Sequence, residues 1–112
     1  MNVYDCANEL AKAIKESREL EKLQEAKTAL DKDADAKKMV DDFLEASQEV
    51  DIARMQGKTP DPVKEDKVKQ LYTILALNND AQTYINALMR FNMMMGDISK
   101  TISEPVQSVI GA

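Results

Sequence analysis

Residues 81–96 read AQTYINALMRFNMMMG, and this stretch decides what kind of fold the 112-residue chain adopts. It holds a single charge, Arg90, and four of the seven methionines. Apolar or small side chains recur here and beyond at every third or fourth residue, which is the spacing of one face of an α-helix. The recurring positions are Ala81, Tyr84, Leu88, Phe91, Met95, Ile98 and Ile102, with apolar flanks at Ile85, Met89, Met93 and Met94.

A helix that is apolar on more than one side needs cover on more than one side, and a chain this short buries a limited core alone. We therefore expect self-association, as a dimer or a higher oligomer. The predicted oligomer interface consists of Tyr84, Leu88, Phe91, Met95, Ile98 and Ile102. Two alternatives stay open for the methionines: an adaptable surface for another protein, because methionine tolerates varied shapes, or a small-molecule or metal carrier.

The composition predicts an all-α fold. Aromatic residues make up 4% of the chain, tryptophan is absent, and glycine and proline number three each, too few for a many-turned β fold. We expect a single helical domain over residues 1–112. Its predicted architecture is an antiparallel helical bundle or hairpin of four to five helices, oligomeric, with a long C-terminal helix.

Capping residues mark the predicted helices. Asn2 is a candidate N-cap for an apolar row that Ser17 interrupts, so the first segment is either one bent helix or two helices. Asp33 is the candidate N-cap of a helix over 34–56, and Gly57 follows it as a candidate C′ residue. Asp61-Pro62 restarts a helix with Pro at its first position.

The last helix is predicted to begin at an Asp80 cap and to end near Ser103, before Glu104-Pro105. Val106, Val109 and Ile110 then prolong the apolar spacing as a short tail. Gly96 lies inside this helix, where glycine costs about 1 kcal/mol relative to alanine, so it predicts a close helix crossing or a kink.

The sequence contains few residues of the types that catalyse reactions or bind metals. Histidine is absent, which removes the commonest general base, the partner of catalytic Ser or Cys, and imidazole metal ligands. We expect no catalytic residues, no cofactor and no metal site, and hence no enzyme. Cys6, the one cysteine, cannot form an internal disulfide, and its place in an apolar row predicts a buried core residue.

One pattern imitates a calcium-binding loop: Asp31, Asp33 and Asp35 alternate, with Asp42 at the twelfth position. However, Ala36 stands where the turn needs glycine, Lys38 replaces an apolar residue, and Asp42 is too short for the usual bidentate glutamate. An acidic cluster at a helix start, stabilised by the helix dipole, is the favoured interpretation.

Charge further limits the partners. The net charge is −5, because residues 1–56 hold 14 acidic and 9 basic side chains while residues 57–112 hold 6 of each. No basic stripe is present, so we expect no direct nucleic-acid binding. No run approaches the roughly 18 apolar residues of a membrane span, and the N-terminus lacks a signal peptide's apolar run. We therefore expect a soluble, cytoplasmic protein without a membrane partner.

The order of several motifs resembles the YlbF/YmcA/YheA family of small bacterial helical proteins, most closely its YheA-like branch. The similar stretches are Asn2-Val3-Tyr4-Asp5, Ala7-Asn8-Glu9-Leu10, Ala13-Ile14-Lys15-Glu16-Ser17, Phe43, Gln56-Gly57, Asp97-Ile98 and Ile102-Ser103-Glu104-Pro105-Val106. They are packing and capping residues and cover nearly the whole chain.

The resemblance implies an antiparallel helical fold that self-associates, without enzyme activity. YlbF and YmcA relatives are subunits of a cytoplasmic regulatory complex linked to competence, sporulation, biofilm formation and mRNA processing through an endoribonuclease. Those relatives are associated with cysteine-bound iron–sulfur clusters, which the single Cys6 does not carry over. Two functions follow as hypotheses: a non-enzymatic scaffold or adaptor that forms homo-oligomers, or a regulatory factor in RNA processing or developmental control that acts through a protein partner.

Overall fold

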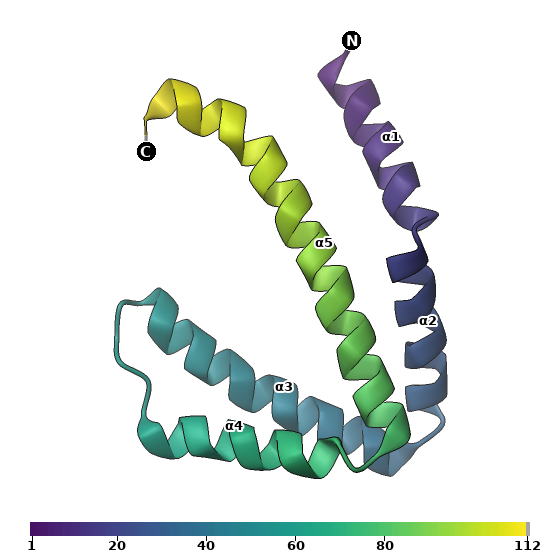
Figure 1. Cartoon of the computed structure of the whole chain (residues 1–112), viewed down its shortest axis with the longest axis vertical. Helices are drawn as coiled ribbons and strands as arrows, with labels where there is room; N and C mark the ends of the chain where they lie inside the picture. The colour runs from purple at the N-terminus through teal and green to yellow at the C-terminus, as the bar shows by residue number, and fades with distance from the viewer. Residues whose placement is uncertain (112) are drawn as a thin grey trace. The chain divides into compact units, whose positions relative to one another are not determined.

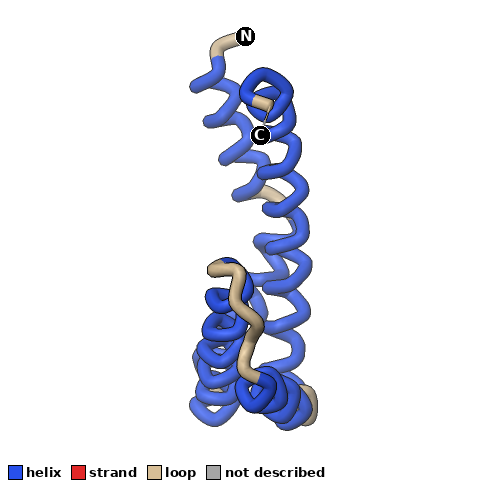
Figure 2. Tube along the Cα trace, turned by 90° about the vertical axis from the view of Figure 1, so that its left-hand side faces the viewer, coloured by secondary structure: helices blue, strands red, loops and turns tan. Residues whose placement is uncertain are grey.

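The computed structural model describes residues 1–111, which form five α-helices joined by short connections (Figures 1 and 2). No strand occurs in this described range, so the predicted all-α class is confirmed. The helices are α1 (Val3–Lys15), α2 (Arg18–Asp31), α3 (Ala34–Met55), α4 (Pro62–Leu75) and α5 (Asn79–Ile110). Three of the predicted N-caps, Asn2, Asp33 and Asp61, are confirmed by side-chain oxygens that accept backbone N–H groups.

The serine at the first break separates two helices, which settles the alternative that the sequence left open. Ser17 Oγ donates a hydrogen bond to the carbonyl of Ile14 (2.6 Å) and accepts one from the backbone N–H of Leu20 (3.2 Å). One hydroxyl therefore serves both the end of α1 and the start of α2.

Gly57 ends α3 in the way its position predicts. Its φ of +74° lies in the left-handed region, where glycine carries no Cβ penalty. The Gly57 N–H bonds to the Arg54 carbonyl (3.0 Å) and the Lys58 N–H to the Ala53 carbonyl (2.9 Å), which together form a Schellman motif.

Both predicted ends of the last helix are wrong. The N-cap is Asn78, whose Oδ1 accepts the backbone N–H of Ala81 (3.0 Å), and α5 begins at Asn79 instead of after Asp80. At the other end, α5 continues through Pro105 to Ile110. Pro105 lacks an N–H for the Thr101 carbonyl, but both residues are exposed, so water can replace that hydrogen bond. The 32-residue helix is thus about 48 Å long.

The predicted single domain comprises two compact units. We call Ala26–Ile85 the hairpin unit, and Met1–Glu25 together with the chain from Asn86 onward the terminal unit. Helices α2 and α5 each contribute to both units.

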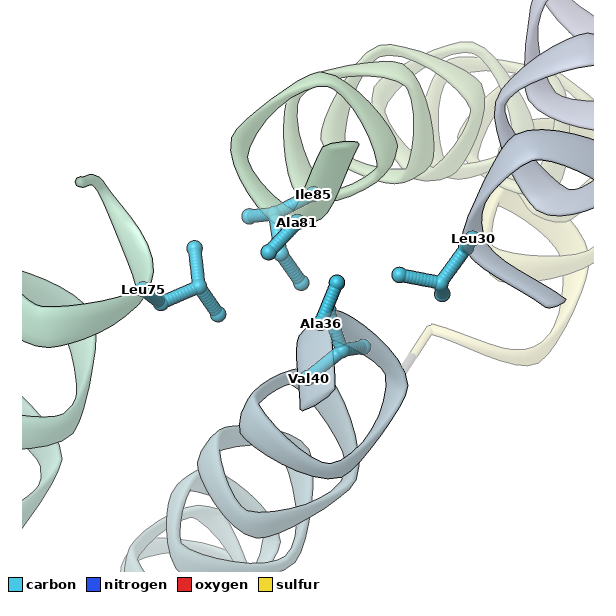
Figure 3. Packing of buried hydrophobic residues seen from close by; sticks show 6 residues of the cluster. All are labelled: Leu30, Ala36, Val40, Leu75, Ala81 and Ile85. Atoms are coloured by element: carbon cyan, nitrogen blue, oxygen red, sulfur yellow. The ribbon is translucent and has the colours of Figure 1, made fainter. Parts of the chain in front are cut away.

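The hairpin unit holds the buried core. Within it, α3 and α4 lie side by side and form the one helix pair with extensive close approach in the described part of the chain (Figure 1). Buried side chains from α2, α3, α4 and the start of α5 point toward one another, as Figure 3 shows for Leu30, Ala36, Val40, Leu75, Ala81 and Ile85. Phe43 and Tyr84 pack against this cluster, and the Phe43 ring lies 5.6 Å from the Tyr72 ring, centroid to centroid.

Candidate self-association surface

The terminal unit lacks a comparable core. Helix α1 is strongly amphipathic, yet none of its residues is buried. Val3 and Tyr4 are exposed, and so is Cys6, which corrects the expectation that this cysteine is a buried core residue. Cys6 shares an apolar row with Val3, Leu10 and Ala13, and within the described terminal unit no residue of this row is buried.

The predicted interface residues on α5 fall into three groups. Tyr84 lies in the hairpin unit and is half-buried against its core. Ile102 is 57% exposed. The four positions between them are half-buried, namely Leu88, Phe91, Met95 and Ile98.

The apolar row continues on the helix beyond the predicted interface residues. Because α5 continues through Pro105, Val106 and Val109 lie on the same helical face as Ile102, and Val109 is 86% exposed. The sequence predicted that these valines prolong the apolar spacing in a short tail after the helix, because proline ordinarily ends a helix. Their spacing of four and three residues beyond Ile102 is the same helical spacing that the row has before Pro105.

Two methionines lie outside the row. Met89 and Met93 are exposed, and Met93 reaches 70%. Their helical positions place them near the charged residues Arg90, Asp97, Lys100 and Glu104, which share the opposite face of α5. None of these four charges forms an ion pair within residues 1–111.

Gly96 is exposed and unconfined. A Cβ added there would meet nothing within 4 Å, and the helix is continuous through this position. Of the two alternatives that the glycine predicts, the close crossing does not occur within residues 1–111.

Lysine side chains form ion pairs with the acidic residues near the start of α3. Asp31 accepts a hydrogen bond from Lys27 Nζ (2.6 Å) and lies 3.4 Å from Lys37 Nζ, while Asp42 pairs with Lys38 Nζ at 2.9 Å. The hydrogen bond from Lys27 lowers the pKa of Asp31, and the same contact raises the pKa of Lys27. Among the described residues, no group of three potential Cys, Asp or Glu ligands is placed to hold a metal ion.

One shallow depression lies between α3 and α4. Its volume is about 250 Å³, and it is lined by three carboxylates together with Lys67, Ala46 and Leu71. No helix in the described part of the chain combines the length and apolar character needed to cross a membrane. The apolar faces of the terminal unit are thus the surfaces with the clearest potential for function.

Comparison with known proteins supports the resemblance drawn from the motifs. Residues 3–107 match the family described as "Control of competence regulator ComK, YlbF/YmcA". A UPF0342 protein of Caldicellulosiruptor saccharolyticus is 40% identical over 105 residues, covering 94% of this chain and 88% of its own length. A UPF0342 protein of Alkalihalophilus pseudofirmus is 33% identical (98% and 93% covered), and one of Streptococcus agalactiae serotype III is 32% identical (97% and 98% covered).

Proposed function

The chain belongs to the YlbF/YmcA family, and we propose that it acts as a non-enzymatic helical adaptor that self-associates through the apolar face of α5. The observation that carries this proposal is the continuous apolar row from Leu88 to Val109, which the chain leaves half-buried or exposed. Large apolar rows on a helix in water favour association, because each fully buried aliphatic or aromatic side chain contributes about 1.5–3 kcal/mol.

The residue inventory supports a role without catalysis. The absence of histidine removes the usual proton-transfer group, and Asp31, the one described carboxylate with a shifted pKa, is a solvent-accessible partner of Lys27. The depression between α3 and α4 offers carboxylates and one lysine but no activated nucleophile. We therefore assign function to the surface and not to a pocket.

Light scattering coupled to size-exclusion chromatography tests the proposal directly. We expect a mass of at least two chains at micromolar concentration. Leu88→Asp or Met95→Asp should shift the protein toward the monomer, because assembly would bury an unpaired carboxylate. Asn86→Asp adds the same carboxylate at an exposed position on the charged face and serves as the matched control.

Far-UV circular dichroism of each variant separates lost assembly from lost folding. A monomeric wild-type protein at these concentrations would overturn the proposal, as would equal masses for Leu88→Asp and the wild type.

The second candidate is a regulatory factor in RNA processing or developmental control that acts through a different protein. The family description, which names control of a competence regulator, favours it. Affinity capture from native lysate with mass spectrometry tests this candidate, with Leu88→Asp as the comparison bait. Recovery of the chain alone from the wild-type bait would count against a regulatory partner.

A further inference from the structure

The burial of α5 changes at Gly96. Upstream of this residue the helix contributes fully buried side chains such as Ile85. Downstream, every residue from 97 to 110 is exposed except Ile98 and Ser103, which are half-buried. We call residues 97–110 the C-terminal arm, which is about 21 Å long at 1.5 Å per residue.

The sequence of the arm has a low intrinsic preference for the helix. It reads DISKTISEPVQSVI, contains no alanine or leucine, and has six β-branched residues. Such side chains lose rotamer freedom in a helix, and the side chains of Asp and Ser compete for backbone hydrogen bonds. Residues 79–95, in contrast, include two alanines, one leucine and four methionines, which are good helix formers. The two parts of α5 therefore differ before any packing is considered.

Local backbone features weaken the helix further, at the start of the arm and in its middle. A Cβ added at Gly96 would meet nothing within 4 Å, so no packing requires glycine there, and only proline favours a helix interior less. Pro105 provides no N–H for the Thr101 carbonyl. The hydroxyls of Thr101 and Ser103 donate to carbonyls four residues earlier, at 2.9 Å and 2.8 Å, a contact that slightly destabilises and bends helices.

Tertiary contacts within residues 1–111 do not compensate for these features. The one helix pair with extensive close approach in this range is α3 with α4, so no helix packs extensively against the arm. The charged side chains of the arm form no ion pair in the same range, and the last turn of α5 has no basic residue to oppose the helix dipole. The N–H of Gly111 donates to the Gln107 carbonyl (2.7 Å), which closes the helix end locally. A helix of about 12–15 residues without tertiary packing is marginal in water.

We propose that the C-terminal arm is an order–disorder element, which unwinds and refolds as one unit from Gly96 while the rest of α5 stays helical. The structure shows the helical form, in which Ile102, Val106 and Val109 share one face. In the unwound form these side chains no longer share a face, so this part of the apolar row exists only while the arm is helical. Any contact made through it must order the arm. Unwinding is a property of the single chain and does not depend on self-association.

Amide hydrogen exchange at single-residue resolution tests the proposal, over a dilution series of the wild-type protein with light scattering on the same samples. At the lowest concentration, protection in the arm should be about tenfold or more below that of residues 87–95. Gly96→Ala should raise protection about fivefold throughout the arm, including its last two turns, because the arm cannot unwind without residue 96 and alanine favours the helix. Asn92→Ala also places alanine at an exposed position, four residues earlier and outside the arm, and should leave protection of the arm unchanged.

Equal protection of the arm and residues 87–95 at every concentration would overturn the proposal. So would an effect of Gly96→Ala that stops within the first turn of the arm, because the helix would then fray from its end instead of unwinding as one unit. An equal gain of protection in Asn92→Ala would also overturn it, since Gly96 would then not be the boundary. Light scattering reports separately on the proposed function: a monomer would overturn self-association and leave the unwinding of the arm intact.

Discussion

Both units of the chain are built from amphipathic helices, yet they bury their apolar rows to different degrees. In the hairpin unit, α3 and α4 pack together, and side chains such as Leu75 and Ile85 are almost completely buried. In the terminal unit, α1 has no buried residue and Val109 is 86% exposed. The hairpin unit can therefore be stable within one chain, whereas the terminal unit retains apolar surface for association.

The lengths of the segments that connect the helices explain part of this difference in burial between the two units. Ion pairs between Arg54 and Glu65 (3.2 Å) and between Lys64 and Glu49 (3.8 Å) join α3 to α4 near their connection. A short connection keeps these two helices antiparallel and adjacent, and so their apolar faces meet at small entropic cost. The two segments of the terminal unit are separated by the whole hairpin unit in sequence.

The largest expected contrast comes from truncating one leucine in each unit. Leu75→Ala should lower the free energy of unfolding by about 2–5 kcal/mol, because it leaves a cavity in a fully buried site. Leu88→Ala should cost clearly less in a dilute sample, since Leu88 is only half-buried. Urea denaturation followed by circular dichroism measures both, with the exposed Ile74→Ala as control. Equal losses for Leu75→Ala and Leu88→Ala at the lowest concentration would contradict the distinction between the units.

Replacing Gly57 and Gly96 by alanine should change stability in opposite directions. Gly57→Ala should destabilise the protein by roughly 1–2 kcal/mol, because its φ of +74° is unfavourable for a residue with a Cβ. Gly96→Ala should stabilise the dilute chain by up to about 1 kcal/mol, because nothing lies near the added methyl group and alanine favours a helix. Thermal unfolding at low concentration measures both changes. A lower melting temperature for Gly96→Ala would indicate that another part of the chain does approach this position.

Cys6 reports on α1. Its thiol is exposed in the single chain, so a maleimide should label it rapidly in the dilute Leu88→Asp variant. In the assembled wild-type protein, labelling should be several-fold slower, because a second copy that covers the apolar face of α5 would also shield the apolar row of α1 that contains Cys6. Mass spectrometry of timed samples gives the rates, and urea-unfolded protein sets the fully accessible rate. Identical rates in the two samples would place α1 outside the assembly.

The smallest expected effect concerns pH and the hairpin unit alone. The pKa of Asp31 lies below its ordinary value of 3.8, so its contribution to stability is present above pH 3.8 and is lost as the pH falls through the lowered pKa. The pKa of Lys27 lies above 10.5, so its contribution is present below pH 10.5 and is lost as the pH rises through the raised pKa. Because the pair is solvent-exposed, both changes in stability should be small.

Carboxyl NMR titration measures the first of these shifts. Lys27→Met should raise the pKa of Asp31 toward 3.8, whereas Lys32→Met, which removes a nearby charge without an ion pair in residues 1–111, should change it less. An unchanged Asp31 pKa in Lys27→Met would show that the hydrogen bond does not cause the shift.

Local signals predicted most of the helix boundaries. Asn2, Asp33 and Asp61-Pro62 mark helix starts, and Gly57 marks an end, because a cap acts on backbone groups two or three residues away. The same reasoning failed at Pro105, where the loss of one hydrogen bond at an exposed position does not end the helix. At Ser17 the sequence left two alternatives, and the hydrogen bonds of the hydroxyl distinguish them.

The residues alone were sufficient to predict an all-α chain with a long, apolar C-terminal helix, because helical spacing and capping depend on near neighbours. The division of that helix was not predictable in the same way. Ala81 and Ile85 share a continuous apolar pattern with Leu88 and Ile102, yet the first two are buried in the hairpin core and the last two are not. Burial depends on which distant segments meet, and periodicity carries no information about those long-range contacts.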